Sequence, residues 1–351
     1  MNLSPMAQAT VLLTCYFSAA SAAIINSSDN VKPLSTAEWG RFALWLNQQG
    51  ATPADLLRAD VSVLLQGCQI AQLEASRILQ LLKRGHSLAL ALEKWQRAGL
   101  WLVTRSDAEY PTRLKQRLKN ASPPVLFGCG NKALLNAGGL AVVGSRNAVT
   151  DDLLFTQQVG AKAAAAGVAI VSGGARGVDE AAMLGAMHSS GAVVGVLADS
   201  LLKAATSAKW RQGLMNGTTV LISSVYPEAA FSAAHAMARN RYIYCLADSA
   251  LVIHSSTKGG TFNGASENLQ QAWVPLWVKP THDIQAANAC FVAKGGRWAE
   301  ADINNLNIAA LMVSQPVPAM VVGEPAVAGY NTASQLQADL FDTSHLNSEL
   351  S

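Results

Sequence analysis

The amino-acid sequence predicts an α/β fold with a mainly parallel sheet that helices cover on both faces. Short β-branched runs alternate with segments of helical period from residue 101 to residue 278, which is the pattern of repeated strand–helix–strand units. Two of these runs, 141–143 and 168–171, each break into a small-residue turn that carries an arginine. Half of the residues are hydrophobic and 14% are charged, so the chain can bury a large core.

A chain of 351 residues exceeds the usual size of one core, and we expect two folded units and a tail. The predicted parts are a helical N-terminal domain over residues 1–99, a sheet domain over 100–285 and a C-terminal extension over 286–351. Beyond residue 316 the Pro, Ala, Gly and Ser content is high and no helical or strand period remains, so we expect little order there.

Charge and cysteine content limit the function classes. The net charge of +3 and the pI near 8.6 permit a polyanionic partner without requiring one. Five separated cysteines without a C-x-x-C pair indicate a reduced, cytoplasmic protein without a zinc site. The apolar run 7–25 is predicted to be the first helix of the N-terminal bundle, and a signal peptide is the alternative. The helix is preferred because a signal peptide usually begins with positive charge, and MNLSPM carries none. Polar residues in this run weaken a membrane span, so no membrane partner is predicted.

The N-terminal domain is predicted to consist of short helices between residues 33 and 99. Ser35 and Glu38 have the spacing of a capping box, and the helix that they open ends at Gly50. Further helices are predicted over 55–58, 61–68, 72–84 and 86–95, with Gly85 ending the third of them. We interpret the tryptophans of this domain as core residues rather than as contacts for a partner.

The sheet domain is predicted to begin at residue 101. Its Pro111 starts a helix on which Arg113, Lys115, Arg117 and Lys119 spread around the surface as solvated charges. The predicted strands are 101–104, 125–128, 141–143, 168–171, 193–197, 219–222, 251–253 and 274–278, and the predicted helices between them include 152–166, 179–189, 201–215, 231–246 and 261–271.

The two arginine-bearing turns are predicted to form an anion-binding crevice. Helix N-termini offer unpaired N–H groups, and glycines let an anion approach the backbone closely. Arg146 and Arg176 are expected at strand carboxyl ends, where open α/β sheets bind ligands. The alternative is that these arginines are solvated and that the glycines only permit tight turns. The glycines in question are Gly144, Gly173, Gly174 and Gly177.

A third arginine-bearing segment is a candidate for the same crevice. Arg239, Asn240 and Arg241 cluster in or beside a helix, and guanidinium groups match the geometry of phosphate. An exposed helix face without a ligand is the alternative interpretation.

The loop of Lys258, Gly259, Gly260 and Thr261 repeats the order of strand, glycine turn and helix start. Thr261 is expected to cap the following helix, while the glycines expose backbone N–H groups. Glu267, two turns further on, is interpreted either as a base that faces the crevice or as a solvated glutamate.

No residue pattern indicates catalysis. His254 stands at a strand end without a partner of triad spacing, and we interpret it as a hydrogen-bonded structural residue, with a contact to the ligand as the alternative. The candidate nucleophiles Ser172, Ser200 and Cys245 have no identifiable base. We therefore predict a binding protein with no catalytic residue, no metal and no cofactor.

Taken together, the segments resemble the DNA-processing protein A family, also called DprA or Smf. The resemblance rests on the ordered set LVTRSDAEYPTRL, PPVLFGCGN, AVVGSRNAV, VSGGARGVDEAA, GVLADS and RNRYIYCLADSALVIHSSTKGGT. It implies an extended Rossmann-like domain that binds single-stranded DNA without sequence preference, protects incoming strands during natural transformation and loads the RecA recombinase. The resemblance also implies a homodimer.

The resemblance assigns DNA-binding residues position by position. His254 departs from the family, which usually has an acidic residue there, and the Lys258 to Thr261 loop matches only loosely. The first turn matches at Gly144, Ser145 and Arg146, the second at Ser172, Gly173, Ala175, Arg176, Gly177 and Asp179 with Gly174 where leucine is common, and the third element at Arg239, Asn240 and Arg241.

A second resemblance gives an alternative function. KGGTFNGASE is similar to the Gly-Gly-x-Gly-Thr loop and downstream glutamate of nucleotide-ligand sensors and of phosphoribohydrolases in the same wider group. On that interpretation the ligand is a nucleotide, and Glu267 binds it or acts in catalysis. A scaffold that has lost its ligand is a third interpretation.

Overall fold

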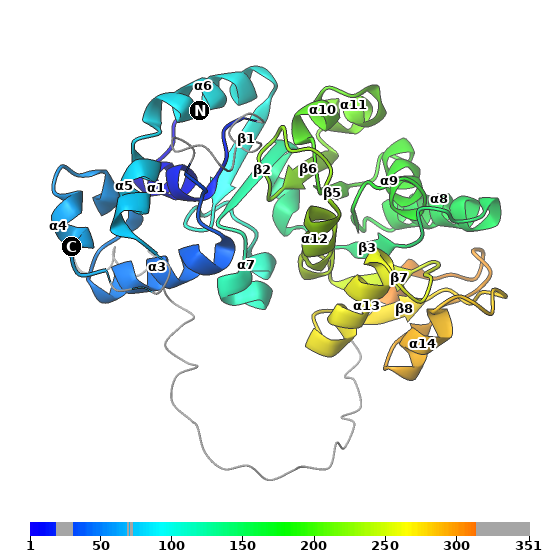
Figure 1. The fold of residues 1–351 in the computed structure, drawn as a ribbon. Coiled ribbons are helices and arrows are strands. Elements are labelled where there is room, and N and C mark those ends of the chain that lie inside the picture. Colours follow the sequence, from blue (N-terminus) through cyan, green and yellow to red (C-terminus); the bar gives the residue numbers. More distant parts are fainter. Residues whose placement is uncertain (19–30, 69, 71–72, 314–351) are drawn as a thin grey trace, which may run out of the picture.

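Figure 1 shows the computed structural model of the protein, which describes residues 1–18, 31–68, 70 and 73–313. Two predictions fall outside the described residues. They are the low order expected beyond residue 316 and the later part of the predicted first helix, residues 19–25.

The fold is organised around one nine-stranded sheet in the order β1-β2-β6-β5-β4-β3-β7-β8-β9. Strand β2 runs antiparallel to both of its neighbours, β1 and β6, and every other adjacent pair is parallel. The predicted fold class is therefore confirmed. The strands are β1 Leu100–Thr104, β2 Val125–Gly130, β3 Leu140–Val143, β4 Ile170–Ser172, β5 Val193–Leu197, β6 Thr219–Ser223, β7 Ser249–Val252, β8 Leu276–Val278 and β9 Arg297–Trp298.

The strand order reverses between β3 and β7. From β3 the chain proceeds outward through β4, β5 and β6, whereas β7, β8 and β9 proceed outward on the other side. At such a reversal the loops after the two central strands diverge and leave a crevice at the carboxyl end of the sheet.

Helices cover both faces of the sheet because buried side chains alternate along its strands. Leu140 and Val142 of β3 face one core, and Ala141 and Val143 face the other. In the described residues the helices are α1 Pro5–Thr14, α3 Thr36–Gln48, α4 Val61–Leu65, α5 Ala75–Leu82, α6 Gly85–Arg97, α7 Thr112–Leu118, α8 Thr150–Ala165, α9 Val178–His188, α10 Leu201–Ala205, α11 Ala208–Met215, α12 Ala233–Leu246, α13 Gly260–Gln271, α14 Asn288–Ala293 and α15 Ile308–Met312, with short 3-10 turns η1 Pro53–Leu57, η2 Lys119–Ala121 and η3 Lys132–Asn136.

Helices α8 and α9 pack on the first face of the sheet, together with the N-terminal α1 and α6. Helices α7, α12, α13 and α14 contribute to the core on the opposite face. These two layers put the N-termini of α8, α9 and α13 at the carboxyl end of the sheet, where the crevice opens.

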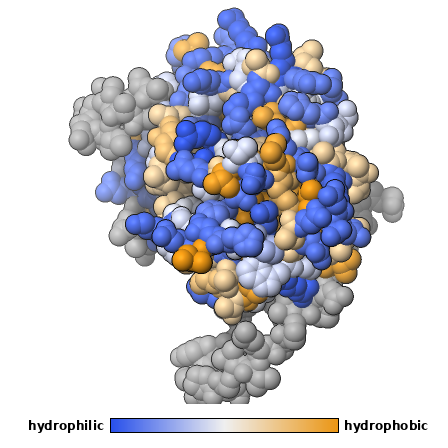
Figure 2. Space-filling model, turned by 90° about the vertical axis from the view of Figure 1, so that its right-hand side faces the viewer, coloured by the Kyte–Doolittle hydropathy of each residue, from blue (hydrophilic) through white to orange (hydrophobic). Residues whose placement is uncertain are grey.

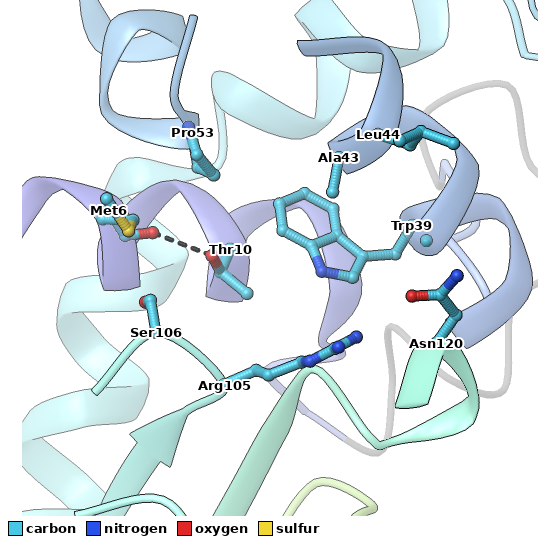
Figure 3. Close-up of a pocket in the computed structure, with 10 residues that line it drawn as sticks. Met6, Thr10, Trp39, Ala43, Leu44, Pro53, Arg105, Ser106 and Asn120 are labelled. Atoms are coloured by element: carbon cyan, nitrogen blue, oxygen red, sulfur yellow. Dashed lines mark hydrogen bonds between the residues drawn. The ribbon is translucent and has the colours of Figure 1, made fainter. Parts of the chain in front are cut away.

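The N-terminal helices have a third core, which α1 connects to the sheet. Leu13 belongs to the N-terminal core, whereas Val11 and Leu12 contact the sheet core. The predicted capping box at Ser35 and Glu38 opens α3. A small cavity of about 30 Å³ lies between α1, α3 and the segment after β1, with the Trp39 indole and the Arg105 side chain in its wall (Figure 3).

Several local predictions were wrong for identifiable reasons. Gly85 begins α6 rather than ending α5, and the predicted helix 201–215 is divided into α10 and α11. Arg113 and Arg117 are half-buried and paired rather than free surface charges, because Arg113 pairs with Asp248 at 3.0 Å and Arg117 donates to main-chain carbonyls. The partners come from distant segments, which helical spacing alone does not show.

The surface that Figure 2 shows mixes hydrophilic and hydrophobic residues without one broad apolar area. Within the described ranges, no helix combines the length and the apolar character that crossing a bilayer requires.

Arg117 provides a test of how α12 is held. Its Nη1 donates to the carbonyl oxygens of Cys245 and Ala247 at 2.9 and 2.6 Å, at the end of α12 where such oxygens lack helical partners. We expect Arg117→Met to lower the free energy of unfolding by about 2 kcal/mol, because charged hydrogen bonds to main-chain oxygens are lost. Urea denaturation measures this change. Lys115→Met on the same helix is the control, and an equal effect of the two substitutions would contradict the capping role.

Candidate functional site

A crevice of about 470 Å³ opens where the strand order reverses. The loops after β3 and β4, one side of α12 and the loop before α13 surround it. It therefore brings together residues of all four predicted segments. The predicted residues in its lining are Gly144, Ser145, Arg146, Asp179, Arg239, Asn240, Lys258, Gly259, Gly260 and Thr261.

A second hollow of about 380 Å³ continues the crevice past Arg146. Arg146, Phe231 and Arg239 line both cavities, and Arg176 lines only the second. Gly173 and Gly174 form part of its wall. The two predicted arginine turns thus lie on one continuous groove.

The floor of the groove is built on the carboxylate of Asp179, which is 7% exposed. This carboxylate accepts hydrogen bonds from the backbone N–H groups of Gly144, Gly173 and Ala175. Three N–H groups of the arginine turns, including those of Gly144 and Gly173, are therefore occupied by a carboxylate of the protein itself. Asp179 lies in the first turn of α9, whose N-cap is Gly177, so the helix begins slightly before the predicted start at residue 179.

Ser172 is also part of the floor. Its hydroxyl is fully buried and donates to the carbonyl oxygen of Val142 at 2.6 Å. The side chain therefore joins β4 to β3 beneath the groove, and the structure does not place it where a ligand contacts it.

Two glycines allow the loops to approach one another. A Cβ at Gly173 would lie 1.5 Å from Nη1 of Arg239, so only glycine leaves room for the guanidinium. Gly177 has φ 93°, and a Cβ there would lie 2.5 Å from the carbonyl oxygen of Ser145. The loops after β3 and β4 are in direct contact as a result, and Arg176 donates to Asn147 at 2.9 Å across them.

Arg239 is the most unusual group of the groove. It is 5% exposed, and neither its Nε nor its Nη1 has a hydrogen-bond partner. The nearest carboxylate oxygen, of Asp179, lies 3.9 Å from Nη1. Burial lowers the pKa of Arg239, and the charge of Asp179 opposes that shift. A buried guanidinium with free donors is costly unless an anion satisfies it.

The same buried surroundings also shift the pKa of the Asp179 carboxyl. Burial raises its pKa to about 6, against the opposing effects of Arg239 and of the three backbone donors. Asp179 therefore gains a proton in the mildly acidic range, and Arg239 then has no charged partner in contact.

The rim combines positive charge with exposed apolar groups. Arg146, Arg176 and Lys258 are exposed. The guanidinium of Arg146 lies 5.2 Å from the ring centre of Phe231, which is 54% exposed. Phe231, Met237 and Asn147 also line the groove and were not predicted as site residues from the sequence. The signal that could have found Phe231 is its position as the first residue of the predicted helix 231–246, directly after the polar break YPEAA.

The loop before α13 is hydrogen-bonded to the loop after β3 and to helix α12. Thr261 donates through its hydroxyl to the carbonyl oxygen of Gly144 at 3.0 Å, and Asn240 donates to that of Gly260 at 2.9 Å. The backbone of Ser145 donates to the carbonyl oxygen of His254 at 2.9 Å. The loops after β3 and β7 therefore form one hydrogen-bonded unit.

Arg241, Glu267 and His254 do not line the groove. Arg241 pairs with Glu267 at 3.0 Å, two positions along α12 from Arg239 and hence on another side of the helix. His254 contacts Asp283 at 2.9 Å, in agreement with its interpretation as a hydrogen-bonded structural residue.

The candidate nucleophile Cys245 is buried, and burial raises the pKa of its thiol to about 12. Within the ranges that the structure describes, no group of three His, Cys, Asp or Glu side chains is arranged to hold a metal ion.

Comparison with known proteins shows the family. The sequence model of the DNA recombination-mediator protein A family matches residues 101–301, which is more than half of the chain. A DprA-type DNA processing protein of Mycobacterium tuberculosis is 32% identical over 190 residues, which are 50% of this chain and 48% of that protein. The chain thus spans about half the length of the curated relative that it matches.

Two solved structures share the fold. DNA processing protein A of Streptococcus pneumoniae superposes with a TM-score of 0.63 at 18% identity, over 88% of this chain and 99% of that one. DNA processing protein A of Helicobacter pylori, described for its single-stranded DNA binding mode, gives a TM-score of 0.50 at 21% identity, over 59% of this chain and 93% of that one. Because the family model matches residues 101–301, the chain belongs to the DNA recombination-mediator protein A family.

Proposed function

We propose that this protein binds single-stranded DNA in the groove, through phosphates and without sequence preference. The observation that carries the proposal is the buried Arg239, whose Nε and Nη1 have no partner and which lines both cavities. Phosphate oxygens accept two parallel hydrogen bonds from a guanidinium, and such a contact satisfies donors that are otherwise buried without a partner.

The rest of the groove fits a strand rather than a single phosphate. Arg146 and Arg176 stand at successive positions along the two cavities, and Lys258 extends the positive rim. Phe231, between the cavities, offers a ring on which a base stacks. Because stacking and phosphate contacts do not distinguish bases, the expected binding is tolerant of sequence and steeply dependent on salt.

We propose that the protein acts in the cytoplasm as a homodimer, where it protects incoming strands and loads the RecA recombinase during DNA uptake and recombination. Family membership supports this role. Analytical ultracentrifugation tests the dimer, and RecA filament formation on strands already coated with single-strand binding protein tests the loading. A monomer, or no gain in filament formation, would remove the corresponding part of the proposal.

The nucleotide-ligand alternative receives less support. It needs Glu267 at the ligand, and Glu267 instead pairs with Arg241 outside the groove lining. The cavity of 470 Å³ is nevertheless of nucleotide size. Titration with a fluorescent oligonucleotide and with nucleoside monophosphates, with an assay for released base, separates the two functions.

Arg176 tests the phosphate contacts. Arg176→Ala is expected to weaken binding of oligo(dT) more than tenfold, a loss of over about 1.4 kcal/mol, because an exposed phosphate-contacting charge is removed. Fluorescence anisotropy at near-physiological salt measures it. Arg97→Ala, which removes an exposed charge from α6, is the matched control. Equal affinity of the two folded variants would refute the placement of the strand.

Phe231 tests the stacking contact. Phe231→Ala is expected to weaken binding of oligo(dT) by about 1 to 2 kcal/mol, the range for one base on one aromatic ring. Phe231→Trp should retain binding, and Leu154→Ala on α8, another half-exposed apolar residue, should have no effect. An unchanged affinity after Phe231→Ala would show that no base lies on this ring.

The pKa of Asp179 predicts that the DNA affinity depends on pH. Burial raises the pKa of the Asp179 carboxyl to about 6, and the charged group that acts on it is Arg239. Arg239 is itself near the charges of Arg146 and Asp199. Below that pH the carboxyl is protonated, so the positive charge of Arg239 is uncompensated. We expect DNA affinity to rise roughly fivefold, about 1 kcal/mol, between pH 7.5 and pH 5.

Asp179→Asn is the control for this pH effect. It should bind DNA with little change over the same pH range, because the titrating group is gone. Because the pKa of Asp179 in the folded protein lies above the ordinary value of 3.8, its carboxyl contributes fully to stability below about pH 4 and loses that contribution as the pH rises through 6. A wild-type affinity that falls on acidification would contradict this assignment.

A further inference from the structure

The acidic residues of the chain are unevenly distributed. Residues 314–351 contain four carboxylates and no lysine or arginine, so the preceding residues hold all 26 basic residues but only 19 of the 23 acidic ones, a formal charge of +7. Three of the four carboxylates, Asp339, Asp342 and Glu349, fall between residues 339 and 349. Leu340 and Phe341 stand between the first two. This segment is therefore both acidic and apolar.

The groove has the complementary chemistry. Arg239 has buried donors without partners, and carboxylates accept the same paired hydrogen bonds from guanidinium groups as phosphates do. Phe231 and Met237 are 54% and 50% exposed in the groove lining. Bases and phosphates of a DNA strand satisfy these two kinds of group, and so do the aromatic and acidic side chains of residues 339–342.

The covalent connection permits this contact within one chain. The last described helix, α15 (Ile308–Met312), packs beside α8 and β7, and Trp277 of β8 donates to its Leu311 at 3.0 Å. From Val313 to Asp339 there are about 26 residues, whose fully extended length is at most roughly 90 Å. A compact body of this size has a radius of gyration of only about 20 Å. The acidic segment can therefore reach the groove.

We propose that residues 339–349 dock in the groove of the same chain and compete with single-stranded DNA. The proposal rests on the proposed DNA-binding function. A tethered competitor acts at high effective concentration, so even weak contacts lower the apparent DNA affinity. DNA then binds only to the fraction of molecules whose groove is open.

The test uses the full-length chain. Asp339→Asn/Asp342→Asn/Glu349→Gln removes the charges of the docking segment, and Glu324→Gln removes a tail charge outside it. The triple variant is expected to bind oligo(dT) about tenfold more tightly than wild type at low salt, by fluorescence anisotropy. Glu324→Gln should stay within about twofold of wild type. Equal affinities of the triple variant and wild type would overturn the proposal.

A second measurement does not depend on DNA. A fluorescent peptide of residues 335–351 is titrated with the triple variant, in which the groove is open. Binding that Arg239→Gln or Phe231→Ala weakens supports docking at the groove, even if no form of the chain binds DNA and the proposed function fails. No binding, or binding that neither substitution changes, overturns the docking whether or not DNA binds.

Discussion

The buried carboxylate of Asp179 is the constraint on which the site depends. It collects backbone N–H groups from the loops after β3 and β4, and it provides the nearest negative charge to Arg239. A charge at this depth is expensive, and several hydrogen bonds are needed to offset the loss of water. Once those bonds form, both loops adopt one arrangement, and their exposed side chains face a common groove.

The same arrangement leaves part of Arg239 without partners. Two donors of a buried guanidinium are unsatisfied, and each such group typically costs about 1–3 kcal/mol of stability. Proteins retain local costs of this kind mainly at functional sites, where a ligand compensates them. Gly173 is part of this arrangement because any side chain there would occupy the space of the guanidinium.

One departure from the family pattern has a structural explanation. His254 occupies a position at which the resemblance leads us to expect an acidic side chain. Here Asp283, from the loop after β8, places a carboxylate 2.9 Å from the ring of His254. The main chain of His254 still accepts the hydrogen bond of Ser145 that joins the loops after β3 and β7. The acidic group is therefore supplied from elsewhere, and the loop connection is retained.

The sequence by itself determined the fold class, eight of the strands and the glycine turns, because these depend on local period and on the conformational freedom of glycine. The short strand β9 and the helices α14 and α15 were missed because they carry little periodicity of their own and are held by neighbours. Only the tertiary structure decided which of the predicted site residues face the groove. Arg239 lines the groove, whereas Arg241 pairs with Glu267. Asp179 and Ser172 are buried beneath the surface of the groove. Burial and ion pairing depend on residues far apart in the chain, so no local pattern contains them.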